Sequence, residues 1–165
     1  MNAFASHIVS GGKARAVMIM AALVVLALFP SPRLMAADAT APAIVPPFAE
    51  RLAAADLVRG RVVFGACRTC HYPDRGAGHQ NGPSLWSIFG KQAGTQVGFA
   101  YYSTALKDSA LVWSPEYLDA WLADPSGFVP GNMMMSLGVP DPQDRADLIA
   151  YLMQFRETPG QSPPP

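Results

Sequence analysis

The chain has 165 residues, half of them hydrophobic, and its 12 basic and 12 acidic side chains leave no formal net charge. This length accommodates one domain with a targeting segment or a tail to spare. The even balance argues against the basic face that nucleic-acid binding needs, and the sequence contains neither a hydrolase triad pattern nor a phosphate-cradling glycine loop.

Residues 1–36 have the composition of a secretory signal peptide. Lys13 and Arg15 precede 14 apolar residues at 16–29, and small residues follow at 36–39. A basic start, a short apolar run and an Ala-x-Ala-like exit are the parts of such a peptide, and the run is shorter than the roughly 20 residues that span a bilayer. We expect cleavage and export, with an uncleaved membrane anchor as the alternative. From residue 37 onward there are nine basic and twelve acidic side chains, a net charge of about −3.

The rest of the chain predicts one small all-α domain. Residues 37–52 form an Ala/Pro-rich linker, residues 53–157 the domain, and residues 158–165 a Pro-rich disordered tail. No internal repeat and no long alternating strand pattern occurs within the domain. We expect several short helices and loops that wrap around a bound group.

Three helices have clear sequence signals. The first covers residues 53–66, where Gly60 and Phe64 lie one turn apart on one face. The second begins at Ser114 as N-cap, with Pro115 as its first residue, and ends at Pro125. The last begins at residues 141–142, and its apolar stripe has helical spacing. This stripe consists of Leu148, Tyr151, Leu152 and Phe155. Shorter helical turns are expected at 83–89 and 103–107.

Residues 67–71 (CRTCH) contain both cysteines of the chain. Cys-x-x-Cys-His is the attachment pattern of c-type haem, in which Cys67 and Cys70 bond to the porphyrin edge and His71 binds the iron. A thioredoxin-like dithiol has the same cysteine spacing but belongs to a βαβ pattern that the sequence lacks. A structural zinc site is another alternative for the two cysteines, but it needs four ligands. The remaining alternative is an inert disulfide.

The second face of the iron would need its own ligand. His79 follows His71 by eight residues, too short a loop to cross the porphyrin plane, and we interpret it as a loop histidine. Met133, Met134 and Met135 lie in a Pro/Gly loop between two helices, where three flexible core residues are unusual. One of the three is the expected ligand, and residue chemistry alone does not say which.

At this point the sequence resembles the class I cytochromes c, especially their small exported bacterial members. The resemblance covers about residues 56–156. The matching segments, in the family's order, are Gly60 and Phe64, residues 67–71, His79, residues 81–85, Phe89 and Gly90, residues 98–101, Trp113, Pro130 and Gly131 with Met133 and Met134, and residues 145–152. The resemblance implies the cytochrome c fold and one covalently attached haem c.

The resemblance also implies roles for individual residues. Cys67 and Cys70 match the thioether anchors, His71 matches the proximal ligand, and the Pro83 carbonyl matches the acceptor of the His71 ring N–H. Counting from Pro130 and Gly131 forward and from Gly138 back selects Met134 as the distal ligand. Tyr101 and Trp113 match residues that hydrogen-bond a haem propionate. Gly60 and Phe64 match a first-helix surface that packs against Leu148 and Tyr151.

Three positions depart from the best-known members of the family. Lys91 stands where an arginine near the propionate is usual, Trp121 replaces a tyrosine that bonds the ligand sulfur, and Ser136 replaces an aromatic that covers the haem edge. The acidic mature chain also lacks the family's lysine-rich face, so docking through a basic patch is not expected.

The sequence therefore predicts a periplasmic electron carrier, not an enzyme, that shuttles single electrons between a donor and an acceptor redox protein. Three alternatives remain. The chain could be a haem-based catalyst or gas-binding sensor with a labile distal ligand, a dedicated subunit of one periplasmic dehydrogenase, or a dithiol oxidoreductase without haem.

Overall fold

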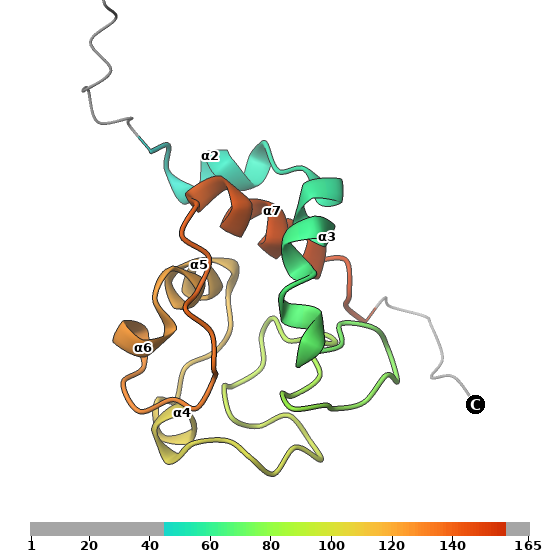
Figure 1. Ribbon diagram of the computed structural model, residues 1–165, viewed down its shortest axis with the longest axis vertical. Helices are drawn as coiled ribbons and strands as arrows, with labels where there is room; N and C mark the ends of the chain where they lie inside the picture. Colours follow the sequence, from blue (N-terminus) through green and yellow to red (C-terminus); the bar gives the residue numbers. More distant parts are fainter. Residues whose placement is uncertain (1–44, 158–165) are drawn as a thin grey trace, which may run out of the picture. The chain divides into compact units, whose positions relative to one another are not determined.

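The computed structural model describes residues 45–157, which form short helices joined by long loops (Figure 1). Within that range the only β-type pairing is an isolated antiparallel bridge between Gln92 and Val112. The helices are α2 (Phe48–Ala53), α3 (Leu57–Phe64), the 3-10 turn η2 (Cys67–Thr69), α4 (Thr104–Asp108), α5 (Pro115–Ala123), α6 (Pro125–Phe128) and α7 (Pro142–Leu152). The all-α prediction is confirmed. The predicted signal peptide, linker residues 37–44 and the predicted tail lie outside the described residues.

Side-chain caps determine where the main helices begin. The Ser114 hydroxyl accepts the Tyr117 N–H at the start of α5, and the Asp141 carboxylate caps α7. Each cap is followed by a proline at the first helical position, as the sequence predicts. The predicted helix 53–66 is instead divided, because the Asp56 carboxylate accepts the N–H groups of Val58 and Arg59 and starts α3 there.

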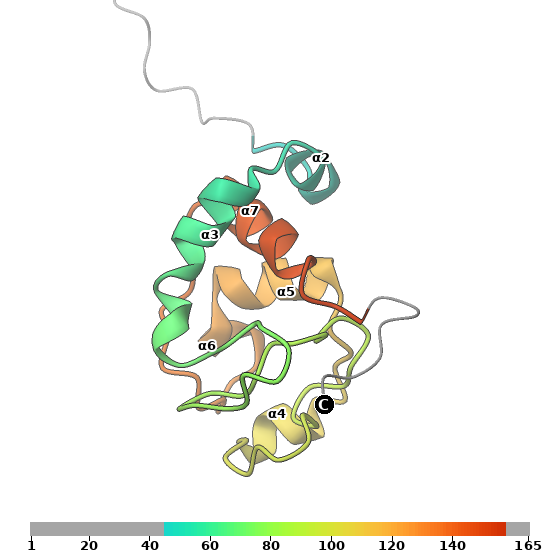
Figure 2. The ribbon, with the colours of Figure 1, turned by 90° about the vertical axis from the view of Figure 1, so that its right-hand side faces the viewer.

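Residues 48–52, which the sequence places in the linker, are helical. They belong to α2, whose Arg51 side chain is only 7% exposed. α2 lies against α7 and is part of the packed domain (Figures 1 and 2). The linker prediction is wrong here because this helix depends on contacts with residues far along the chain.

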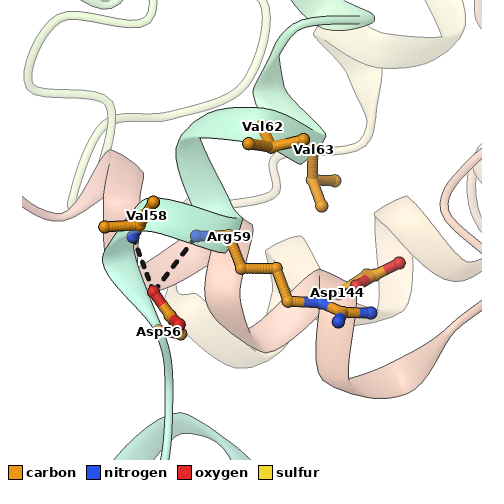
Figure 3. A pocket seen from close by; sticks show the side chains of 6 residues that line it. All are labelled: Asp56, Val58, Arg59, Val62, Val63 and Asp144. Carbon is orange, nitrogen blue, oxygen red and sulfur yellow. Dashed lines mark hydrogen bonds and ion pairs between the residues drawn. The ribbon is translucent and has the colours of Figure 1, made fainter.

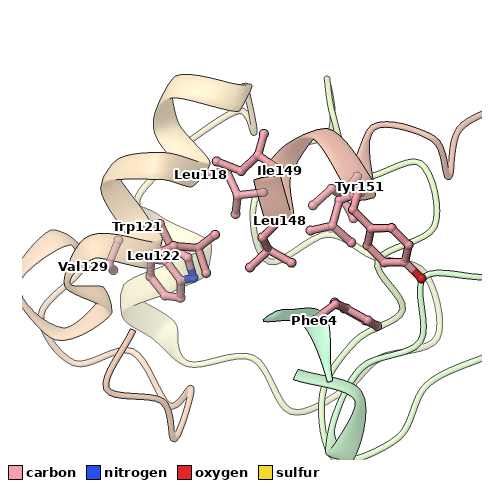
Figure 4. Close-up of a cluster of buried hydrophobic side chains, with 10 residues drawn as sticks. Phe64, Leu118, Trp121, Leu122, Val129, Leu148, Ile149 and Tyr151 are labelled. Atoms are coloured by element: carbon pink, nitrogen blue, oxygen red, sulfur yellow. The ribbon is translucent and has the colours of Figure 1, made fainter. Parts of the chain in front are cut away.

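The core forms where α7 contacts both α3 and α5. Phe64 and Tyr151 place their ring centroids 5.6 Å apart, and a Cβ atom on Gly60 would lie 2.9 Å from that of Tyr151. The predicted contact between the first and last helices is therefore confirmed. Leu148 and Ile149 extend the cluster toward α5 (Figure 4).

Two long loops connect these helices and carry most of the candidate site. The first runs from η2 to α4, and the second runs from the end of α6 to α7. Figure 2 shows the first loop, in green, below the helical layer and leading into α4. Between residues 45 and 157, no helix is both long enough and apolar enough to cross a membrane.

Candidate functional site

Both cysteines lie at the end of α3, where the chain tightens into η2. The N–H groups of Cys70 and His71 both donate to the Cys67 carbonyl at 3.0 Å. The two thiols are free and half-buried. Burial raises the pKa of Cys67, and the nearby Cys70 adds to this effect. The motif therefore presents two thiols and an imidazole on one tight turn.

His71 is oriented by the loop that follows it. Its Nδ1 atom lies 2.7 Å from the Pro83 carbonyl oxygen, so Nδ1 carries the proton and donates to that carbonyl. Burial lowers the pKa of His71, and the Pro83 bond partly opposes this. The ring is thus neutral near pH 7, with Nε2 left as the nitrogen that can bind a metal.

Gly82 lets the loop approach this ring. A Cβ atom at Gly82 would stand 2.4 Å from Cε1 of His71 and 2.7 Å from its Nε2. The Gly82 N–H also donates to the Cys70 carbonyl at 2.8 Å, which ties the loop back to the cysteine motif. Glycine is the residue that permits so close a passage of backbone beside the imidazole.

His79 has both ring nitrogens engaged by the backbone. Its Nδ1 accepts the Ser84 N–H at 2.9 Å, and its Nε2 therefore donates to the Val97 carbonyl at 2.8 Å. These bonds join residues 79–84 to the loop near residue 97. The interpretation of His79 as a loop histidine is confirmed by this geometry.

The three methionines differ sharply in exposure. Met133 is 69% exposed and Met135 fully exposed, whereas Met134 is half-buried and packs against the core cluster. The Met134 N–H donates to the Asn132 side chain at 2.9 Å. Met134 is thus the inward-facing thioether of the run.

Cys67, Trp113 and Met134 all pack, half-buried, against the same core cluster. The Trp113 ring meets the buried Trp121 ring edge to face, with centroids 5.5 Å apart. The Trp113 N–H also donates to the Lys91 carbonyl, and Lys91 Nζ in turn donates to the Trp86 carbonyl and the Gln96 side chain. Three of the sequence-predicted residues thus pack against one core cluster from different segments of the chain.

The two adjacent tyrosines point differently. Tyr101 is 78% exposed, while Tyr102 is half-buried and packs its ring edge to face on Phe99, with centroids 4.9 Å apart. Burial raises the pKa of Tyr102, against a smaller lowering by a backbone hydrogen bond from Gln96. The sequence did not single out Tyr102. No local pattern separates it from Tyr101, an identical side chain one residue earlier.

Comparison with known proteins places the chain in a family. No family model matches it. A cytochrome c from Chlamydomonas reinhardtii is 45% identical over 102 residues, which cover 61% of this chain and 90% of the relative. The chain belongs to the cytochrome c family. A cytochrome c from Gossypium barbadense is 47% identical over 88 residues, or 53% of this chain and 78% of that protein.

A solved structure supports the same family and fold. Cytochrome cH from Methylobacterium extorquens superposes with a TM-score of 0.56 at 39% identity, covering 60% of this chain and 98% of that one. The chain therefore has the cytochrome c fold. It is an electron carrier rather than an enzyme, and its cofactor is one covalently attached haem c.

The donors of the chain fit this group. Two free thiols lie beside the His71 imidazole, whose Nδ1 is held by the Pro83 carbonyl. The loop backbone passes close to this ring because residue 82 is a glycine. Thiols form the covalent anchors of haem c, and neutral imidazole is a usual axial ligand. A half-buried thioether at Met134 is available as the second axial donor.

A separate recess lies on the outer side of α3 and α7 and is not part of this arrangement. It is open, has a volume of about 450 Å³, and is lined by Asp56, Val58, Arg59, Val62, Val63 and Asp144 (Figure 3). Arg59 reaches across it to Asp144 at 2.5 Å. Because its lining has neither thiol nor imidazole, it offers no attachment for haem.

Proposed function

We propose that this cytochrome c is an exported, periplasmic carrier whose single haem is ligated by His71 and Met134 and anchored by Cys67 and Cys70. The observation that carries the proposal is the neutral His71 ring held by Pro83 at 2.7 Å, together with Met134 as the half-buried member of its run. When bound, the haem iron supplies a one-electron couple.

The chain's own residues determine how that couple behaves. The Pro83 carbonyl orients His71 and increases the basicity of its Nε2. A thioether from Met134 favours the ferrous state and raises the reduction potential. With both axial positions filled, small ligands cannot readily reach the iron, so electron transfer is the expected activity. In this proposal Trp113 and Tyr101 bond a haem propionate, although the 78% exposure of Tyr101 makes Tyr102 a second candidate.

The partners are an electron donor and an electron acceptor protein that dock briefly at the exposed haem edge. Transient redox complexes have small interfaces. The loop that contains Met134 also exposes Met133, Met135 and Leu137, and residues 126–140 contain no charged side chain. We therefore place docking on apolar contacts around this loop.

Absorption spectroscopy of the exported protein tests the ligation. A covalently held haem with a sulfur-to-ferric-iron charge-transfer band, and no CO binding after reduction, supports the His71 and Met134 pair. Ready CO binding by the unmodified protein would favour a catalyst or gas sensor. A colourless protein, purified from cells that have a competent haem-attachment system, would favour a dithiol oxidoreductase that uses Cys67 and Cys70.

Export rests on residues 1–36, where Lys13 and Arg15 precede the apolar run at 16–29. The mass of the purified protein tests it, since cleavage after Ala36, Ala37 or Ala39 gives three distinct masses. Recovery in the periplasmic fraction with one of these masses supports the proposal. A full-length protein in the membrane fraction would instead support an uncleaved anchor.

A further inference from the structure

A cluster of three charged side chains joins α2, α5 and α7. Asp119 of α5 accepts hydrogen bonds from Nη2 of Arg51 at 3.0 Å and from Nε of Arg145 at 2.8 Å. Both arginines are buried, and the Asp119 side chain is only 15% exposed. Charges this far from solvent remain favourable only while each keeps its partners. We call these residues the Arg51–Asp119–Arg145 cluster.

Both arginines also donate hydrogen bonds to backbone carbonyls. The Arg51 guanidinium donates to the carbonyls of Pro46 and Pro142, which fastens α2 to the start of α7. Nη1 of Arg145 donates to the carbonyls of Val139 at 2.9 Å and Pro140 at 3.0 Å. Those two carbonyls lie immediately after the methionine-containing loop, residues 133–138.

That loop is held mainly at its two ends. At the entry, the Asn132 side chain bonds the carbonyls of Pro125 and Val129 and accepts the Met134 N–H. At the exit, the Val139 N–H donates to the Leu122 carbonyl at 2.7 Å. Gly138, with φ +89°, passes so close that a Cβ atom would stand 2.5 Å from the same Leu122 oxygen.

Between these ends Met134 packs against the core cluster, and the neighbouring side chains of the loop are largely exposed. Met135 and Leu137 are fully exposed and Met133 is 69% exposed. The position of the Met134 side chain therefore depends on how well the entry and the exit are fixed. The Arg145 bonds are a large part of the exit, and Asp119 holds Arg145 in place for them.

We propose that the Arg51–Asp119–Arg145 cluster is a positioning device for the distal ligand: by fixing the loop exit, it limits how often Met134 leaves the iron. The three residues act through the backbone of Val139 and Pro140. The inference rests on the proposed ligation by Met134. It also gives α2 a role in the site, although the sequence places residues 48–52 of this helix in the linker.

The cluster's charges predict a graded effect of substitution. Arg51→Met leaves Asp119 paired with Arg145 and removes only the hydrogen bonds that Arg51 itself makes. Asp119→Asn leaves two buried guanidinium groups without a counter-charge, so Arg145 is drawn toward other acceptors. The second change should therefore loosen the loop exit more than the first.

Exogenous imidazole measures loop opening directly, because it binds ferric iron only when Met134 is displaced. The apparent dissociation constant of imidazole is inversely proportional to the fraction of molecules in which the loop is open. We expect the apparent dissociation constant for imidazole to fall roughly tenfold in Asp119→Asn, as expected for losing one charged hydrogen bond, and to fall less in Arg51→Met. Arg59→Met is the control, since Arg59 also joins a helix to α7, through ion pairs with Asp144 and Asp147, but its side chain is 56% exposed and its ion pairs do not involve residues 133–140.

Urea unfolding of the same holoproteins, followed by far-ultraviolet circular dichroism, separates positioning from general stability. The proposal expects tighter imidazole binding at zero urea in the cluster variants only, whatever their unfolding midpoints. Imidazole affinity that stays at the wild-type value, or that rises equally in Arg59→Met, would overturn it. If Asp119→Asn does not fold, Arg51→Met at the domain edge still provides the comparison. A wild-type spectrum without the sulfur-to-iron band would overturn the Met134 ligation itself, and this inference with it.

Discussion

Gly60 in α3 lies directly against the backbone of Asp147 in α7: a Cβ atom on Gly60 would stand 2.1 Å from the Asp147 carbonyl oxygen. Asp147 is itself 1% exposed, and its carboxylate accepts the Asp56 N–H at 3.0 Å and the Gln143 side-chain N–H at 2.8 Å. The two helices therefore meet backbone to backbone, and the start of α3 is bonded to the middle of α7. This contact brings the cysteine motif, which follows α3, into its place.

Gly60→Ala should weaken the fold strongly, because the added methyl group can be accommodated only if α3 and α7 move apart. Overpacking of a close contact typically costs 1–3 kcal/mol, and we expect a loss of about 3 kcal/mol in the free energy of unfolding. Urea unfolding followed by circular dichroism measures it. Val58→Ala, on an exposed face of the same helix, is the control and should change stability by less than about 0.5 kcal/mol. Equal stability of the two variants would contradict the close packing.

Met134→Ala should remove the sulfur-to-ferric-iron band, lower the reduction potential and allow CO to bind the reduced protein. The reason is that Met134 alone of the described run packs against the core, while Met133 and Met135 face solvent. Met133→Ala and Met135→Ala are matched controls and should keep the band. If the band survives in Met134→Ala and disappears in a neighbour, the ligand register is off by one.

Tyr102→Phe should shift the reduction potential more than Tyr101→Phe. The Tyr102 side chain is half-buried, whereas the Tyr101 side chain is 78% exposed. Loss of one hydrogen bond worth about 1 kcal/mol more in one oxidation state than in the other corresponds, for a one-electron couple, to a shift on the order of 40 mV. Redox titration of the two variants side by side measures the difference. A larger shift in Tyr101→Phe would restore Tyr101 as the propionate partner.

The parts of the fold that the sequence predicts are those determined by neighbours in the chain. Ser114 with Pro115, and Asp141 with its proline, begin α5 and α7 through bonds to N–H groups two or three residues away. The cysteine motif is likewise contained in five consecutive residues. Spacing alone also predicts that Gly60 and Phe64 share a face, because helical geometry fixes it.

The parts that the sequence does not predict depend on distant contacts. A helix of six residues such as α2 is unstable alone, and its Arg51 bonds residues 68 and 91 positions away. No local pattern reports those partners. Tyr101 and Tyr102 are chemically identical neighbours, so their order in the sequence does not say which side chain turns inward.

Asp141→Asn should reduce the acid sensitivity of the protein while keeping α7 capped. The pKa of Asp141 lies below its usual 3.8, mainly because its carboxylate accepts a hydrogen bond from the Asp144 N–H. Because the folded pKa is the lower one, this stabilisation is complete above pH 3.8 and is lost as pH falls through the folded pKa. An asparagine accepts the same bonds without titrating.

Urea midpoints measured from about pH 6 to about pH 2.5 test this expectation. The wild-type midpoint should fall more steeply than that of Asp141→Asn in the acid part of the range. Glu116→Gln, which removes one acidic charge from the first turn of α5, controls for the change in net charge. Parallel profiles for the wild type and Asp141→Asn would show that the cap carboxylate contributes no acid dependence.

Electron self-exchange between ferrous and ferric copies should depend weakly on salt. Residues 126–140 contain no charged side chain, and the loop presents exposed Met133, Met135 and Leu137. When two copies meet through this loop, only the net charge of about −3 on each mature chain is left for salt to screen. Nuclear magnetic resonance exchange rates should therefore rise by less than about threefold between low and high ionic strength.

Leu137→Lys makes the same experiment diagnostic of the docking surface. In a symmetric encounter, the new lysines of the two copies face each other, so their repulsion slows exchange at low salt and is relieved as salt is added. Val58→Lys introduces the same charge on α3, beside the recess outside the haem site, and serves as the control. We expect a steep salt dependence in Leu137→Lys and a shallow one in Val58→Lys. The reverse order would place the electron-transfer contact on the α3 side and not at the methionine-containing loop.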